Sequence, residues 1–284
     1  MRLFKKKAPR ETDFSNRELP ATRWALLWDC WSGQWRILMA SSWLLALFVL
    51  PLLADYFVFS ALIGGLDASS SSYSSSVFSL LFYASLLAIP CVMALYVGLS
   101  GAFCLAKRLA YLEGTLATSD FFRGLRDGWK RALAVGAIEG TAGAAAFMGS
   151  FYLLLFYASA PIATGIGMGL LIFVFVLVTA TSYYFLSQEA IYDNGFFPTL
   201  KNSFLFALMK MPVNVLFVIM SPGIAIALFL ISQTTAYVAI ALILFFAMDA
   251  AVAFQIYANG VYDQTINETY YPELVGKGLH KKED

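Results

Sequence analysis

Six long apolar runs dominate the pattern of hydrophobic and polar positions along the chain. Each is long enough to cross about 30 Å of hydrocarbon as an α-helix that rises ~1.5 Å per residue. The runs are continuous rather than alternating, and backbone groups in lipid must pair within their own segment, so helices are favoured over barrel strands. We therefore predict an all-α, polytopic membrane protein with six transmembrane helices. The predicted spans cover residues 37–59, 77–105, 133–158, 163–188, 213–231 and 234–257.

Composition supports this class of protein. Of the 284 residues, 60% are apolar and only 13% are charged, which departs strongly from the composition of soluble domains. The predicted organisation has three parts. Residues 1–36 form an N-terminal segment with an interfacial helix, residues 37–258 form the transmembrane domain, and residues 259–284 form a C-terminal tail.

The basic residues all lie on one side of the predicted topology. Of the 19 Lys and Arg residues, eight precede the first span, six lie between the second and third, two lie between the fourth and fifth, and three follow the sixth. The positive-inside rule then places both termini in the cytoplasm of a multi-pass protein in the plasma membrane. Because acidic residues share these loops, the net charge is only +1, and we expect no nucleic-acid partner.

An aromatic and basic pattern occurs before the third run and again before the fifth. A weaker third copy covers residues 24–31, and each copy directly precedes a pair of spans. We predict interfacial helices at about 119–131 and 196–210, and therefore three repeats that each combine an interfacial helix with a transmembrane hairpin. At an offset of 75 residues, Phe121, Phe122, Arg126, Asp127 and Trp129 match Phe196, Phe197, Lys201, Asn202 and Phe204.

These repeated helices have two interpretations. Aromatic residues at helical spacing with basic residues opposite anchor a helix in the headgroup plane of the lipid bilayer. The same face, with Lys130 added to the basic set, also suits a docking platform for a partner protein. The pattern alone leaves both open.

Two carboxyl residues lie well inside the predicted spans. Glu139 and Asp249 are each about two turns from a span end, which at ~1.5 Å per residue is roughly 10–15 Å inside the membrane. No basic residue lies within a span to pair with them. They are candidates for an intramembrane polar site that lines a cavity, or for side chains that bond nearby hydroxyls such as Thr141, Ser182 or Tyr183. Asp55 lies near the outer end of the first span, and we expect it at the interface.

Catalytic and metal-binding motifs are missing from the sequence. There is no nucleotide-binding loop, no H-E-x-x-H and no G-x-S-x-G. His280 is the only histidine, and the three cysteines are odd in number. We therefore expect no cofactor, no metal site, no disulfide and no enzymatic activity.

The stretch from Ile89 to Leu133 resembles the YesL-like family of bacterial integral membrane proteins, a domain of unknown function numbered 624. A second landmark of that family, an L-K-N-A/S segment followed by a proline-led span, is similar to the residues from Leu200 to Pro212. Unlike the family pattern, Cys91, Val92 and Met93 follow the proline here. The family's places in the first stretch are held by Pro90, Gly98, Arg108, Glu113, Asp120, Phe121, Phe122, Trp129 and Lys130.

The resemblance implies a role as an accessory of carbohydrate uptake, with ABC sugar-transporter subunits as partners, because family members often occur beside such systems. Glu189 and Gly195 also partly match the E-A-A-x-x-x-G of the cytoplasmic coupling loop of ABC permeases. The alternative is a small-molecule transporter or channel whose cavity is lined by the intramembrane carboxyls.

Overall fold

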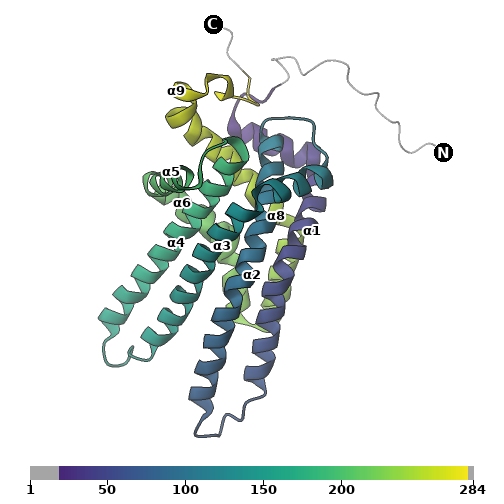
Figure 1. Cartoon of the computed structure of the whole chain (residues 1–284). Helices are drawn as coiled ribbons and strands as arrows, with labels where there is room; N and C mark the ends of the chain where they lie inside the picture. The colour runs from purple at the N-terminus through teal and green to yellow at the C-terminus, as the bar shows by residue number, and fades with distance from the viewer. Residues whose placement is uncertain (1–18, 281–284) are drawn as a thin grey trace, which may run out of the picture.

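Figure 1 shows the computed structural model, which describes residues 19–280. The rest of the predicted N- and C-terminal segments lies outside the described residues. No strand occurs between residues 19 and 280. The α-helices are α1 (Arg23–Gly64), α2 (Tyr73–Ala110), α3 (Ala117–Leu154), α4 (Pro161–Ile191), α5 (Phe196–Met209), α6 (Met211–Val218), α7 (Ile224–Ile231), α8 (Gln233–Tyr262) and α9 (Glu268–Tyr270).

Six helical segments are long and apolar enough to cross a membrane, which confirms the predicted class of an all-α polytopic membrane protein. Five correspond to α1, α2, α3, α4 and a segment that begins in α8. The other, Met211–Ile231, joins α6 and α7 through the π-helical segment η2 (Ile219–Gly223). Pro222 lies within η2, where the wider turn accommodates a residue without a backbone N–H. The third span ends at Leu154 rather than at residue 158, because residues 155–159 form turns.

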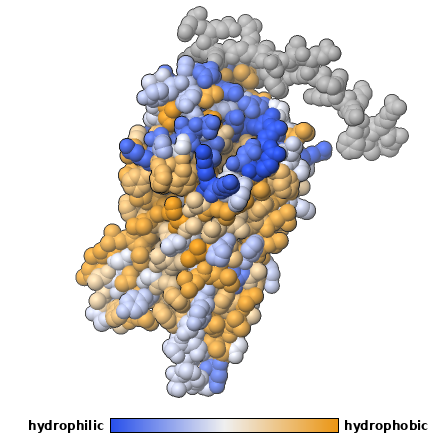
Figure 2. Space-filling view, in the orientation of Figure 1, coloured by the Kyte–Doolittle hydropathy of each residue, from blue (hydrophilic) through white to orange (hydrophobic). Residues whose placement is uncertain are grey.

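Polar and charged residues gather at one end of the bundle, which we call the charged end. It holds both ends of the described chain, the turn over residues 111–116 and the turn over 192–195 (Figures 1 and 2). Hydrophobic residues cover most of the remaining visible surface. The opposite end carries the serine-rich loop over residues 65–72 and the turn between α3 and α4.

The first copy of the repeat lies at the start of α1. Gln34 has non-helical backbone angles (φ −125°, ψ 19°), so residues 23–33 and 35–64 are two helices joined at a kink. Arg23 reaches Asp263 beyond α8, whereas the Thr115 hydroxyl in the α2–α3 turn lies 3.4 Å from the side-chain oxygen of Gln34. Residues 23–33 therefore cross the charged end from one side of the bundle to the other, and their interfacial position in a membrane stays a prediction.

The second and third copies of the repeat differ from one another. The prediction of a separate helix over 119–131 is wrong, because α3 continues to Leu154 with no non-helical residue inside. Its first turns lie against α2, so closely that a Cβ added to Gly124 would lie 2.3 Å from the Cβ of Cys104. The third copy is the separate helix α5, as predicted, because Lys210 breaks the helix and Pro212 begins the next one.

The core lies mostly in the half of the bundle nearest the charged end. One buried cluster, from α2, α3, α4, α5 and α8, is rich in aromatic side chains such as Tyr184 and Phe254. The other joins α1, α2, α3 and α8 around residues such as Leu105 and Met248. Toward the opposite end the α3–α4 hairpin diverges from the α1–α2 hairpin (Figure 1), and exposed side chains such as Leu170 suit contact with lipid.

Candidate functional site

Glu139 is enclosed between α2, α3 and α4. The Thr179 hydroxyl donates to one carboxyl oxygen at 2.6 Å, and the Ser182 hydroxyl donates to the other at 3.1 Å. Tyr96 of α2 also forms a hydrogen bond with this carboxyl group. Glu139 is 6% exposed, so its polar partners come from the protein. The predicted bonding to nearby hydroxyls is confirmed for Ser182.

The helices around Glu139 meet closely because α3 carries small residues there. A Cβ added to Gly136 would lie 2.8 Å from the Cα of Met93, and one added to Gly140 would lie 3.0 Å from the Cα of Ile89. The two glycines, four residues apart, therefore serve helix packing within this chain. They bring the α2 backbone against α3 and seal the carboxyl group from the lipid.

Asp249 lies in a different setting, in a groove between the start of α1 and the helices α6 and α8. The groove has a volume of about 360 Å³ and is lined by Trp24, Trp28 and Trp31 from residues 23–33, and by Ser221 from η2. Its other lining residues are apolar. Glu139 does not line this groove, so the structure does not bring the two predicted carboxyls together in one cavity.

A pair of hydroxyl groups joins α4 to this groove. Tyr183, next to Ser182 on α4, has its hydroxyl 3.3 Å from that of Ser221. Ser221 lines the groove that contains Asp249. The sequence analysis missed Ser221, although its place directly before Pro222 inside an apolar span is a signal for a local break that frees polar groups.

Asp55 is buried against the neighbouring helices. Its side chain lies on α1 at 8% exposure, and its Oδ1 has no hydrogen-bond partner in the part of the chain that the structure describes. Its interfacial depth in the membrane stays a prediction. Position along a span does not decide whether a helix face points to the bundle or away from it.

The repeat specifies the same inside and outside positions in α3 and α5. Phe121 is fully buried, and its counterpart Phe196 packs on Phe185 with ring centroids 5.1 Å apart. The following residues, Phe122 and Phe197, are 48% and 78% exposed. The pattern thus records which side of each helix faces the core. It does not by itself specify a partner site.

The offset of 75 residues continues into the spans. Glu139 corresponds to Asn214, which is also fully buried and donates through Nδ2 to the carbonyl of Ala207 at 2.9 Å. The sequence analysis missed Asn214, and extending the repeat by about two more turns would have found it. The two related segments therefore each carry a buried polar side chain at the matching position.

The exposed faces of the two repeated helices differ in charge. In α3 the exposed face carries Arg126, whose side chain is 82% exposed, and Asp127, at 61%. Lys130 and Trp129 lie exposed beside them. On α5 the exposed residues are mostly apolar, with one cation, and Asn202 is half-buried. The exposed residues of α5 are Phe197, Pro198, Lys201, Phe204, Leu205, Leu208 and Met209.

The segment similar to an ABC coupling loop is held against α3. Arg131 Nη1 lies 2.8 and 2.7 Å from the two carboxyl oxygens of Glu189, and it also donates to the carbonyl of Asn194 at 2.9 Å. The Glu189 carboxylate therefore forms its ion pair within the chain, with Arg131. Gly195, at the end of this segment, is exposed and precedes α5.

Three residues that carry the family resemblance meet in one network at the charged end. Arg108 pairs with Asp120 and lies 3.5 Å from Glu113. Lys277, from the C-terminal segment, donates to Glu113 at 2.9 Å. Burial raises the pKa of Glu113, but the hydrogen bond from Lys277 and the nearby charges of Lys107 and Arg108 outweigh it and hold this pKa below its ordinary value.

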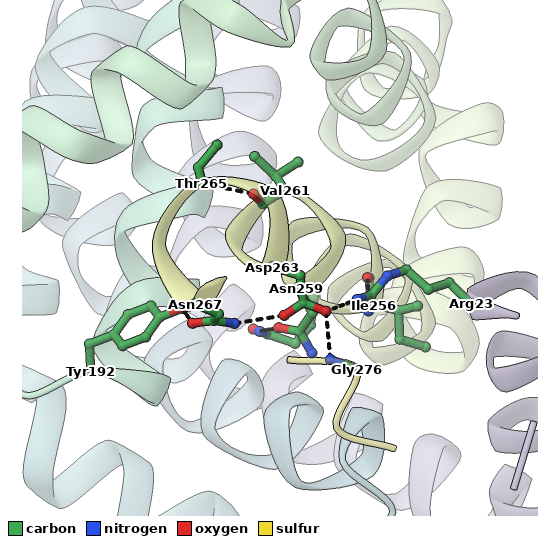
Figure 3. Close-up of polar contacts among 10 residues, drawn as sticks. Arg23, Tyr192, Ile256, Asn259, Val261, Asp263, Thr265, Asn267 and Gly276 are labelled. Atoms are coloured by element: carbon green, nitrogen blue, oxygen red, sulfur yellow. Dashed lines mark hydrogen bonds and ion pairs between the residues drawn. The ribbon is translucent and has the colours of Figure 1, made fainter. Parts of the chain in front are cut away.

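A second network joins the C-terminal segment to the start of α1 and to the turn after α4 (Figure 3). Asp263 Oδ2 accepts from Arg23 Nη2 at 2.5 Å and from the backbone N–H of Gly276 at 2.9 Å. Its Oδ1 accepts from Asn267 at 2.7 Å, and the Tyr192 hydroxyl donates to Asn267 at 2.7 Å. The sequence analysis missed these contacts, and the signal was a tyrosine followed directly by an aspartate after the second and third hairpins.

This architecture defines the class of the protein as an all-α polytopic membrane protein with a polar, well-ordered charged end. Comparison of the chain with protein-family models, with curated proteins and with solved structures gives no match. The resemblance to the YesL-like family accordingly stays a prediction from the quoted residues. The function has to be argued from the geometry.

Proposed function

We propose that this protein is a non-enzymatic component of the bacterial plasma membrane that docks a partner on the cytoplasmic side through the first turns of α3. The partner that the family resemblance implies is a subunit of an ABC-type sugar transporter. The charged end then faces the cytoplasm, because the Lys and Arg residues cluster there.

The exposed face of α3 between Phe122 and Lys130 is the observation that carries this proposal. It presents three cations, Arg123, Arg126 and Lys130, against the single acid Asp127. Its two exposed aromatic residues add apolar contact area of the kind that dominates interface energies. A helix held rigidly against α2 on one side and charged on the other suits an acidic protein surface.

The α5 helix has the opposite balance and fits the anchoring interpretation. Phe197, Phe204 and Met209 are 78%, 44% and 60% exposed, and Lys201 is the only cation on this face. A mostly apolar face with one long basic side chain is typical of a helix at the headgroup level, where the lysine extends to water. We therefore assign lipid contact to α5 and partner contact to α3.

Transport is the second candidate function, and the polar groups inside the spans favour it. Glu139 bonds Thr179 and Ser182, and Tyr183, the next residue on α4, pairs with Ser221 at the groove of Asp249. Ionisable and hydroxyl groups inside spans suit proton movement. Replacing Tyr183 by Phe would abolish transport on this alternative and leave partner docking unchanged.

The docking proposal is tested by co-purification in mild detergent from the native host grown on complex sugars, followed by mass spectrometry of the bound proteins. Recovery of ABC permease or ATPase subunits that is lost in the variant Arg123→Glu, Arg126→Glu, Lys130→Glu supports the proposal. Lys201→Glu on α5 is the matched control and should retain the partner. Purification without any such subunit, or equal loss with the control variant, would show that the proposal is wrong.

A further inference from the structure

The groove beside Asp249 has the form of a ligand site that opens sideways from the bundle. Its roof is the helix over residues 23–33, which crosses the charged end, and its walls are α6, η2 and α8. A volume of about 360 Å³ lies within the range of ~300–1,000 Å³ that small-molecule sites occupy. Met220 and Phe246, which also line it, are 67% and 50% exposed on membrane-spanning segments. The groove therefore faces the hydrocarbon rather than an internal channel.

Asp249 is the only charged residue that lines this groove. Within the described part of the chain, no Lys or Arg pairs with it and no other side chain donates a hydrogen bond to it. A carboxylate without a partner is costly inside the membrane, and such residues pair with a counter-charge where one exists. The chain between residues 19 and 280 does not supply that charge, so a cationic ligand is the partner that complements the ionised form of Asp249.

Three indole rings of the helix over residues 23–33 line the roof of the groove. Trp24 and Trp28 have ring centroids 6.0 Å apart, and those of Trp28 and Trp31 are 5.3 Å apart, with both pairs edge to face. Tryptophan is the best of the aromatic side chains for attracting an ammonium-type cation over its ring. The three residues are 66%, 49% and 48% exposed, so a large part of each side chain is available to a ligand.

We propose that this groove binds an amphiphilic organic cation. Asp249 is its counter-charge, and Trp24, Trp28 and Trp31 form the aromatic roof over it. The ligand class is a permanently charged or protonated amine, or a similar onium ion, that carries an apolar body. The apolar walls and the sideways opening select a compound that partitions into the membrane. No basic residue lines the groove, so an anion would meet only the carboxylate charge.

This site is independent of partner docking by α3, because it is built from α1, α6, η2 and α8. The two proposals can therefore fail separately. A variant that loses the cation should still bind a partner, and a variant of the α3 face should still bind the cation.

The test uses the purified full-length protein in maltoside micelles and two probes of nearly the same shape, tetraphenylphosphonium and tetraphenylborate. Binding is followed by isothermal titration calorimetry and by tryptophan fluorescence. We expect saturable binding of the cation and at least ~10-fold weaker binding of the anion, because a tenfold ratio corresponds to only ~1.4 kcal/mol. Equal binding of the two probes would overturn the proposal.

Variants then locate the binding site. Asp249→Asn should weaken cation binding at least ~10-fold, and Trp28→Leu should weaken it ~3-fold or more, because a cation–π contact is worth ~0.5–2 kcal/mol. Asp193→Asn and Trp43→Leu are the matched controls, since both residues are exposed and neither lines the groove. Far-UV circular dichroism and size-exclusion profiles identify any variant that fails to fold.

Two outcomes contradict the assignment even when the cation binds. Unchanged affinity in Asp249→Asn would place the cation elsewhere. Displacement of tetraphenylphosphonium by short-chain phosphatidylethanolamine, at concentrations where phosphatidylglycerol has no effect, would make the occupant a zwitterionic membrane lipid. Our assignment of a ligand with net positive charge and no phosphate would then be wrong.

Discussion

Arg131 on α3 and Glu189 at the end of α4 form an ion pair in which a single nitrogen, Nη1, lies 2.8 and 2.7 Å from the two carboxyl oxygens. The contact joins the second hairpin at the charged end. It also ties down the residues that lead into α5, because Arg131 binds the carbonyl of Asn194 as well.

Breaking this contact should destabilise the protein. Glu189 is 16% exposed in its side chain and Arg131 is 36% exposed, so Arg131→Ala removes partly buried, charge-assisted hydrogen bonds worth about 1.5–3 kcal/mol. We expect lower thermal stability in detergent for this variant. Arg126→Ala is the control, since its side chain is 82% exposed and should change stability by less than ~0.5 kcal/mol. Equal stability of the two variants would contradict the role assigned to Arg131.

Adding a methyl group at Gly124 should force α2 and α3 apart. The new Cβ would lie 2.3 Å from the Cβ of Cys104, and such overpacking costs about 1–3 kcal/mol. Gly169→Ala on α4 is the matched control, because a Cβ there has nothing within 4 Å and alanine is the better helix former by about 1 kcal/mol. Thermal unfolding followed by circular dichroism should therefore show opposite signs for the two variants.

Removing the shortest hydrogen bond to Glu139 should cost stability without changing side-chain volume much. In Thr179→Val the buried carboxyl group loses its donor at 2.6 Å, and an unsatisfied buried polar group costs about 1–3 kcal/mol. Thr181→Val is the control on the same helix, because the Thr181 hydroxyl bonds only the carbonyl of Leu177 in its own turn. If both variants lose the same stability in a denaturation assay, the Glu139 cluster contributes nothing specific.

The contact between Lys277 and Glu113 should weaken in acid. The pKa of Glu113 is lowered in the folded protein, so its contribution to stability is present above the unfolded pKa of about 4.3 and is lost as the pH falls through the lower folded value. The wild-type protein should therefore be more stable than Glu113→Gln at pH 7. We expect this difference in melting temperature to shrink below about pH 4. A difference that is unchanged at pH 3 would show that the Glu113 charge is not its source.

The number and position of the spans could be predicted because they depend on local hydrophobicity and on the thickness of the bilayer. The end of α5 could also be predicted, since Pro212 prevents the helix from continuing into the next span. In contrast, the boundary predicted near residue 132 does not exist. Nothing between residues 117 and 154 breaks a helix, and glycines such as Gly124 and Gly136 are contact points with α2.

The candidate sites were only partly predictable. Glu139 and Asp249 stood out as carboxyls inside apolar runs, but their separation into a sealed cluster and an open groove depends on which helix faces meet. The tryptophans at the start of α1 were predicted as part of an interfacial helix. Their place over Asp249, more than 200 residues later in the chain, required the tertiary structure.

The sequence by itself determined that this is an all-α membrane protein with six spans, and that its basic residues lie at one end. Those properties follow from the free energy of placing each segment in lipid or water, which is a local quantity. Only the tertiary structure decided that Arg23 pairs with Asp263, that Lys277 pairs with Glu113, and that a groove forms beside Asp249. Such contacts depend on how helices distant in the sequence pack together, and hydropathy along the chain carries no information about that.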